Sequence, residues 1–550
     1  MKRFLARAGV DEGRWWLWNV VVLLGLALLV VLALMHVLQP AWRSVYFYNG
    51  DSLTLALLMK SLWAGEPFRW VFSSQLFLFP EGVVYALCSA VTGSIQASLL
   101  TNSSVAVVLL YAAYWLLARS ILGTREGGHA FAMFATGLLV LYMSCETTPD
   151  INGLTFVTLY LFNTYYYGVV LCGLLVLYWI VQILLYDNRP IFLMREVAGP
   201  LVGILVVTGL TYFSDPLFFL QCSAPFLIAL CILYFSRNVS GRTFIWLVVV
   251  QLLGLMLGSV GRGLCKAYVG NPVVKYFDFW NIVRAIKFLS GVFEEIVHTA
   301  TSLFEYGLMA VGLAVAVAAI VLTWRQRRYQ RFLTTNNLSA ADMMVALIAF
   351  GSPVASISGA LLTGNPWTRY WLPLAVFPVL AVLPLWRRFL HLSHKKTLVA
   401  VLICIAAVAG RYGSSLYAQF MAEGSLKVMQ ADVKCYNRVM SQKPFDTVGG
   451  YWTTRALDLY SDTTSRALQM TGDLHARIWL SNRAPYLSLM FNGIIVDKKL
   501  PEGEKPDHIY DSELRGLGPY SRKFSCPSFD IYYYDTGSVG YIKLNRLLRR

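Results

Sequence analysis

Three charged side chains stand at the ends of apolar segments and could carry chemistry. Asp51 lies in "NGDS" after the first apolar run, Asp150 lies in "TPDING", and Arg369 lies in "NPWTRYW". A carboxylate can take a proton from a hydroxyl group, and a guanidinium can bind a phosphate through its paired donors. Each also has a plainer role: Asp51 as a helix N-cap, Asp150 as a turn residue, and Arg369 as part of an aromatic belt at the membrane edge.

Membrane-spanning helices must position these side chains. The chain has 550 residues, of which 57% are hydrophobic and 14% charged, a composition typical of a polytopic membrane protein. Runs of apolar residues predict about eleven transmembrane helices. We place them at 16–38, 102–121, 129–145, 166–186, 197–213, 217–236, 243–261, 302–324, 343–363, 371–386 and 397–413.

The net charge of +16 is explained by membrane topology, so we expect no nucleic acid partner. Cations gather in alternate loops, as the positive-inside rule requires. They are Arg119, Arg125, Arg189, Arg195, Arg237, Arg242, Arg325, Arg327, Arg328, Arg331, Arg387, Arg388, Lys395 and Lys396. The opposing loops "ETTPDING" and "FSDP" contain acids and no Lys or Arg. We therefore expect a cytoplasmic N-terminus and an extracytoplasmic C-terminus.

With this topology, we expect two long loops and a C-terminal domain on the outer face of the membrane. A transmembrane domain, 1–413, has outer loops 39–101 and 262–301, and an extracytoplasmic soluble domain follows at 414–550. The first loop should hold two short helices, 52–64 and 83–100. The tail has strand-like runs, "ARIWL", "NGIIVD", "FDIYYYD" and "GYIKL", which predict an α/β or α+β fold. Its cysteines, Cys435 and Cys526, could pair or remain separate thiols.

Further polar residues could line a cavity on this face. Glu81 and Asp215 are candidates, although a turn or a helix cap would also explain them. Tyr370, beside Arg369, is another candidate. In the loop 262–301, apolar residues recur at helical spacing and predict an amphipathic helix on the membrane surface.

The charged residues of that helix have two readings. Arg284 and Lys287 could meet a phosphate or face solvent and lipid headgroups. His298 with Glu294 and Glu295 is a poor ligand set, so we predict no metal site there. The sequence specifies no cofactor and leaves dependence on a divalent cation open.

Four features together resemble the GT-C glycosyltransferases, integral membrane enzymes of bacterial and other types. They are "NGDS" after the first span, "FLFPEG" after the first loop helix, the acid in "TTPDING", and "NPWTRYWLPLAVFP". The resemblance covers spans one to ten loosely. The sequence lacks the "HPP" and "WWDYG" signatures of particular subfamilies. We therefore do not expect this chain to use the acceptors of those subfamilies.

The resemblance implies an inverting enzyme of the cell envelope, located in the bacterial inner membrane. Its donor would be a polyprenyl-phosphate sugar and its acceptor an outer-face glycan or lipid. Asp51, or Asp150, would be the catalytic aspartate that acts as a base, and Arg369, Arg284 or Lys287 would bind the donor phosphate. A lipid-linked glycan flippase or transporter and a glycan polymerase or ligase remain alternatives.

Overall fold

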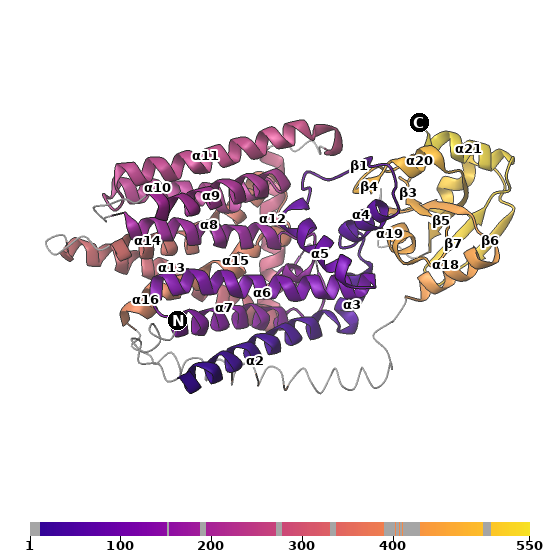
Figure 1. Cartoon of the computed structure of the whole chain (residues 1–550). Coiled ribbons are helices and arrows are strands. Elements are labelled where there is room, and N and C mark those ends of the chain that lie inside the picture. Colours follow the sequence, from indigo (N-terminus) through magenta and orange to yellow (C-terminus); the bar gives the residue numbers. More distant parts are fainter. Residues whose placement is uncertain are drawn as a thin grey trace.

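The computed structural model describes most of the chain. The described residues are 12–150, 153–187, 194–270, 278–330, 337–389, 402, 406, 410, 430–498 and 508–549. They form two parts that lie end to end, a bundle of helices and a smaller region that contains a β-sheet (Figure 1). We call these parts the bundle and the sheet region.

The helices of the bundle are those of a multi-pass membrane protein. Within the described residues, eight helices are long and apolar enough to cross a membrane. They are α2 (Glu12–Val37), α6 (Ile95–Leu122), α7 (Arg125–Cys145), α8 (Tyr167–Tyr186), α9 (Met194–Ser214), α11 (Gly241–Leu264), α13 (Ala300–Gln330) and α14 (Asn337–Leu362). Each coincides with a predicted span, because a long apolar run is a strong signal for a membrane helix.

Two other predicted spans are built from shorter helices. The span at 217–236 consists of η3 (Phe219–Ser223) and α10 (Ala224–Phe235). The span at 371–386 is divided into α15 (Leu372–Val376), η6 (Pro378–Ala381) and α16 (Val382–Phe389). Proline has no amide hydrogen to donate, so Pro378 favours a break in the second of these. The predicted span at 397–413 lies almost wholly outside the described residues, and the total of eleven stays a prediction.

The chain between α2 and α6 lies where the bundle meets the sheet region, and we call this segment the junction (Figure 1). It contains α3 (Pro40–Tyr48), α4 (Thr54–Trp63), β1 (Trp70–Val71), η1 (Leu78–Gly82) and α5 (Val83–Val91). The predicted helix 83–100 is wrong in its extent, because a break at 92–94 divides it. Ser94 caps the next helix by accepting a hydrogen bond from the Ala97 amide at 3.2 Å. Residues 95–100 therefore belong to α6.

The sheet region has five strands in the order β3-β2-β5-β7-β6. They are β2 (Asp446–Gly449), β3 (Ala467–Gln469), β5 (Phe491–Asp497), β6 (Arg522–Ser525) and β7 (Phe529–Tyr533). Strand β2 is parallel to β3 and β5, whereas β7 is antiparallel to β5 and β6. Val448 pairs with Ile494 on one side and Leu468 on the other, which places apolar side chains in the core.

Helices complete the sheet region and correct two predicted strands. The helices are α18 (Ala431–Gln442), α19 (Tyr451–Tyr460), α20 (Ala484–Ser488) and α21 (Val539–Leu548). "GYIKL" lies in α21, where Tyr541, Leu544 and Leu548 share one helical face and are buried. "ARIWL" is irregular apart from a bridge between Ala476 and Met470. The runs "NGIIVD" and "FDIYYYD" do form strands, β5 and β7.

One disulfide crosses the sheet region. Cys435 of α18 is bonded to Cys526, and their Cα atoms lie 5.7 Å apart. The structure thus decides between the two readings of these cysteines in favour of the pair. The other cysteines in the described residues are free thiols at Cys88, Cys145, Cys172, Cys222, Cys231 and Cys265.

The sheet region is fixed to the junction by polar contacts. The short strand β4 (Ser481–Asn482) pairs with β1 in antiparallel fashion. The Asn482 side-chain amide donates to the Ser61 hydroxyl at 2.9 Å, and the Arg466 guanidinium pairs with Glu66. Arg466 also bonds Asp458 of α19, with Nε and Oδ1 2.6 Å apart. These contacts hold α19 beside the loop that carries Asp51.

Candidate active site

Asp51 lies in a turn directly before α4, and its side chain does not cap that helix. Helix α4 begins at Thr54, and its N-cap residue, Leu53, provides no side-chain hydrogen bond. The backbone carbonyl of Asp51, not its carboxylate, accepts hydrogen bonds from the Thr54 amide at 3.2 Å and hydroxyl at 2.8 Å. The capping reading of Asp51 is therefore wrong, and the carboxylate is available for other contacts.

The carboxylate of Asp51 lies among donors from three distant segments. The Tyr451 hydroxyl donates to Oδ1 at 2.6 Å, and the Tyr165 hydroxyl lies 3.5 Å from Oδ2. Arg369 Nη1 lies 4.0 Å from the same Oδ2. The side chains of Asp51 and Arg369 keep 26% and 23% of their accessible surface. The pair is therefore held in position and still reachable by another molecule.

Arg369 turns toward Asp51 from the short helix η5 (Thr368–Tyr370). Its guanidinium lies 5.3 Å from the centre of the Tyr370 ring, and the Tyr370 hydroxyl accepts a hydrogen bond from the Asn365 side chain at 3.1 Å. Nε of Arg369 is buried and has no hydrogen-bond partner in the described part of the chain. This inward position favours an anion-binding role over an aromatic belt facing the lipid.

The electrostatic surroundings stabilise the charge on Arg369. Burial alone would lower its pKa, but the oxygens of Tyr370, Tyr166 and Asp51 outweigh that effect and hold the pKa above its ordinary value. The guanidinium is therefore a permanent cation. Such a group is suited to stabilising an anion that forms during a reaction.

The sheet region completes the site with Tyr451, Arg455 and Arg477. Arg455 donates from Nε to the Gly50 carbonyl at 2.8 Å and from Nη2 to the Thr54 hydroxyl at 2.8 Å. It thus fixes the turn on both sides of Asp51. The guanidinium groups of Arg455 and Arg477 lie 5.0 and 5.1 Å from the centre of the Tyr451 ring.

Gly50 lets the two parts approach closely. A Cβ atom there would lie 2.8 Å from Cε1 of Tyr451 and 3.2 Å from Cδ of Arg455. With a larger residue at this position, the Tyr451 and Arg455 side chains that contact the turn would have to shift. A glycine next to Asp51 therefore fits the close packing between the turn and the side chains of α19.

Asp150 does not join this cluster. Its Oδ2 accepts a hydrogen bond from the Leu154 amide at 2.9 Å, so the carboxylate closes its own loop. Asp150 is exposed, and no hydrogen bond or ion pair among the described residues links it to Asp51. The geometry matches the turn reading, and a catalytic role for Asp150 stays a prediction.

Glu81 and Asp215 are both buried and close enough for their carboxyl groups to interact electrostatically, and no hydrogen bond or ion pair among the described residues links either one to Asp51. Glu81 Oε1 accepts a hydrogen bond from the Gly168 amide at 3.0 Å, and Asp215 Oδ1 accepts one from the Leu217 amide at 2.9 Å. Both residues are 1% exposed, which makes contact with a substrate difficult. Their contacts are those of residues that shape turns and helix ends.

Arg284 and Lys287 are exposed on the predicted amphipathic helix, α12 (Phe279–His298). Arg284 bonds the Asn281 side chain of its own helix. The helix packs against the segment before Arg369, where the rings of Phe288 and Trp367 lie 5.3 Å apart. No described contact joins either cation to Asp51, so their phosphate-binding role remains a prediction.

The described residues contain no group of three or more His, Cys, Asp or Glu side chains able to hold a metal ion. We therefore assign no metal ligands. Dependence on a divalent cation is a question for titration with the purified protein.

Comparison with known proteins gives a weak similarity. No protein-family model and no curated protein matches the sequence. Among solved structures, the archaeal oligosaccharyltransferase AglB from Archaeoglobus fulgidus, in complex with an inhibitory peptide and a dolichol-phosphate, matches with a TM-score of 0.42 and 12% identity. The match covers 86% of this chain and 69% of that chain. Our functional proposal therefore depends on the site itself.

Sequence reasoning missed the residues that the sheet region contributes. It singled out Asp51, Arg369 and Tyr370, which the structure brings together, but not Tyr451, Arg455 or Tyr165. Tyr451 is 400 positions from Asp51 in the chain. No local pattern signals such a contact, because it depends on how the sheet region docks on the junction.

Proposed function

We propose that this chain is an inverting membrane glycosyltransferase. It would transfer a sugar from a polyprenyl-phosphate-linked donor to a hydroxyl group of a glycan or lipid acceptor. The observation that carries the proposal is the partly exposed pair of Asp51 and Arg369, whose Oδ2 and Nη1 atoms lie 4.0 Å apart at the junction. This pair supplies one base and one anion-binding cation beside apolar helices.

The reaction requires only these two functions. Asp51 takes the proton of the acceptor hydroxyl as its oxygen bonds to the anomeric carbon of the donor sugar. The bond from that carbon to the phosphate oxygen breaks, and the phosphate leaves with the electron pair. A lipid phosphate is a stable leaving anion, so no second carboxyl group is needed to protonate it, in contrast to glycoside hydrolysis. A single displacement inverts the configuration of the sugar.

Arg369 would stabilise the departing phosphate. One of its terminal nitrogens faces Asp51, while Nε has no partner in the described residues. A guanidinium has five N–H donors in a planar fork, so it can pair with Asp51 and still bind phosphate oxygens. The low-dielectric surroundings strengthen both interactions.

The two-domain organisation and the orientation form part of the proposal. We infer that residues 1–413 form the transmembrane domain, that 414–550 form an extracytoplasmic domain, and that the N-terminus is cytoplasmic. The positive-inside distribution of Lys and Arg supports this orientation. Labelling of a cysteine introduced at exposed Asp462 by a membrane-impermeant reagent in intact cells would test it, and failure to label unless cells are opened would contradict it.

The direct test is a transfer assay with the purified chain in detergent. A set of polyprenyl-phosphate sugars with short oligosaccharide and glycolipid acceptors should give a product with inverted anomeric configuration, identified by NMR. Detergent removes the two compartments, so product can arise only by catalysis. Transport of a lipid-linked glycan in vesicles, without any transfer in detergent, would support the flippase alternative instead.

Tyr451 should tune the base without being essential to the fold. In Tyr451→Phe, the aromatic ring keeps its contacts with the guanidinium groups of Arg455 and Arg477 but the 2.6 Å hydrogen bond to Asp51 is lost. A hydrogen bond to a charged group contributes about 1.5–3 kcal/mol. We therefore expect the initial rate of Tyr451→Phe to fall roughly tenfold or more. Initial rates over a pH series measure it.

Tyr486→Phe is the matched control for Tyr451→Phe. The Tyr486 hydroxyl also donates a 2.6 Å hydrogen bond, but to the Gln469 carbonyl inside the sheet region. This variant should lose thermal stability with little change in turnover. Equal turnover for Tyr451→Phe and wild type, or equal loss in both variants, would show that Tyr451 does not act on Asp51.

A further inference from the structure

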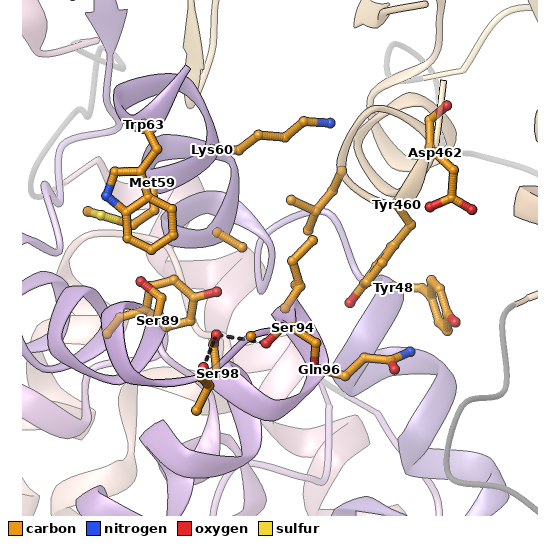
Figure 2. Close-up of a pocket in the computed structure, with 17 residues that line it drawn as sticks. Tyr48, Met59, Lys60, Trp63, Ser89, Ser94, Gln96, Ser98, Tyr460 and Asp462 are labelled. Atoms are coloured by element: carbon orange, nitrogen blue, oxygen red, sulfur yellow. Dashed lines mark hydrogen bonds between the residues drawn. The ribbon is translucent and has the colours of Figure 1, made fainter. Parts of the chain in front are cut away.

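A cavity lies at the junction, and the residues of the Asp51 site do not line it. Its volume is about 630 Å³, within the usual range of small-molecule sites. It is lined by one side of α4, the turn between α5 and α6, and the C-terminal end of α19 (Figure 2). Asp51, Arg369 and Tyr451 are not among its lining residues. A ligand there would touch both parts of the molecule.

The lining combines aromatic rings with neutral and charged polar groups. The aromatic residues are Tyr48, Trp63, Tyr85 and Tyr460, and the polar ones include Lys60, Ser94, Gln96 and Asp462 (Figure 2). A sugar ring presents C–H groups on its faces and hydroxyl groups on its edge. The negative faces of aromatic rings attract such C–H groups, and amide, ammonium and carboxylate groups bond hydroxyls.

The charges of the cavity favour a neutral ligand over a phosphate. Lys60 and Asp462 carry opposite charges in the same lining. The ammonium group of Lys60 already donates to the Asp458 carbonyl, and burial lowers its pKa. A phosphate would have one engaged cation and would also meet a carboxylate. A polyhydroxylated ligand can use both groups, since hydroxyls donate and accept hydrogen bonds.

Tyr460 offers a further point of recognition. Its ring lies 5.1 Å from that of Tyr48, so the two form one aromatic wall. Its hydroxyl oxygen is buried and has no hydrogen-bond partner in the described residues. A buried polar atom without a partner costs free energy, and a ligand hydroxyl would relieve that cost.

We propose that this cavity binds a saccharide and, on the basis of the proposed function, holds sugar units of a glycan substrate beyond the reacting one. Helix α4 extends from Thr54, beside Asp51, to Trp63 at the cavity. At 1.5 Å per residue, Trp63 lies about 14 Å along the helix from Thr54, while Ala56, which also lines the cavity, lies only about 3 Å from it. Because Asp51, Arg369 and Tyr451 do not line the cavity, a sugar bound there is a unit other than the reacting one, and its recognition selects the substrate without taking part in bond breaking.

Binding is tested on the full chain in detergent with free trisaccharides. Saturation-transfer NMR with maltotriose, cellotriose, chitotriose and mannotriose should detect at least one ligand. Trp63→Ala and Gln96→Ala should each weaken that ligand roughly tenfold, because each removes a stacking or hydrogen-bonding contact. Trp324→Ala is the matched control: Trp324 is 66% exposed, close to the 62% of Trp63, but lies in α13 outside the cavity.

Three results would overturn the inference: no trisaccharide binds, Trp63→Ala binds as wild type does, or only short-chain phosphatidylglycerol competes at the site. Asp51→Asn should keep the binding, which separates this inference from the proposed function. In the transfer assay, Trp63→Ala should raise a KM while kcat is kept. A higher KM for the acceptor or for the donor identifies which substrate supplies the distal sugars.

Discussion

Asp51→Asn should abolish sugar transfer while leaving insertion and folding intact. Asparagine has nearly the same shape, and its carbonyl oxygen can still accept the hydrogen bond that Tyr451 donates at 2.6 Å. What it lacks is the ability to take a proton from the acceptor hydroxyl. General-base catalysis contributes about 10²–10⁴-fold to a reaction rate. The initial rate of Asp51→Asn should therefore be lower than that of wild type by at least about 10²-fold.

Asp150→Asn is the informative comparison for this variant. Asp150 is also a predicted catalytic residue, but its Oδ2 accepts the Leu154 amide at 2.9 Å and shapes its own loop. On the geometry, Asp150→Asn should cost stability more than rate. Near-normal turnover of Asp51→Asn, with loss in Asp150→Asn, would transfer the role of base to Asp150. Thermal unfolding and size exclusion in detergent check that both variants are folded.

The long helices were predictable because their signal is local. Eight apolar runs in the described residues are helices of spanning length, since the bilayer requires that length and composition. Boundaries were less predictable. Ser94 starts α6 well before the predicted span, and "GYIKL" joins α21 because its apolar residues also fit a helical face. A short run with two permitted periods does not specify its own structure.

The site was predictable only on the bundle side. Asp51 and Arg369 stand out because a charge next to an apolar segment is expensive and so unusual. No local sequence pattern marks Tyr451 and Arg455 of α19 as site residues. They contact the Asp51 turn only because the sheet region packs on the junction. Glu81 and Asp215 were further candidates for the cavity from the sequence, but they are 1% exposed while Asp51 keeps a quarter of its side chain accessible.

Arg369→Ala should reduce transfer by about 10²–10³-fold, the range observed when one preorganised donor to a developing anion is removed. The variant removes the cation that would face the leaving phosphate, 4.0 Å from Asp51. Arg369→Lys should recover part of the rate, because an ammonium keeps the charge but not the planar fork of donors. Both effects should be measured as kcat and as KM for the donor.

Arg284→Ala distinguishes phosphate binding at Arg369 from a general need for cations on this side of the membrane. Arg284 is exposed on α12 and bonds its own helix, so its loss should change transfer far less. The double variant Asp51→Asn with Arg369→Ala should lose less than the product of the single losses, since residues that act as a unit are not additive. Full additivity, or a folded Arg369→Ala with normal kinetics, would show that the two side chains do not serve one reaction.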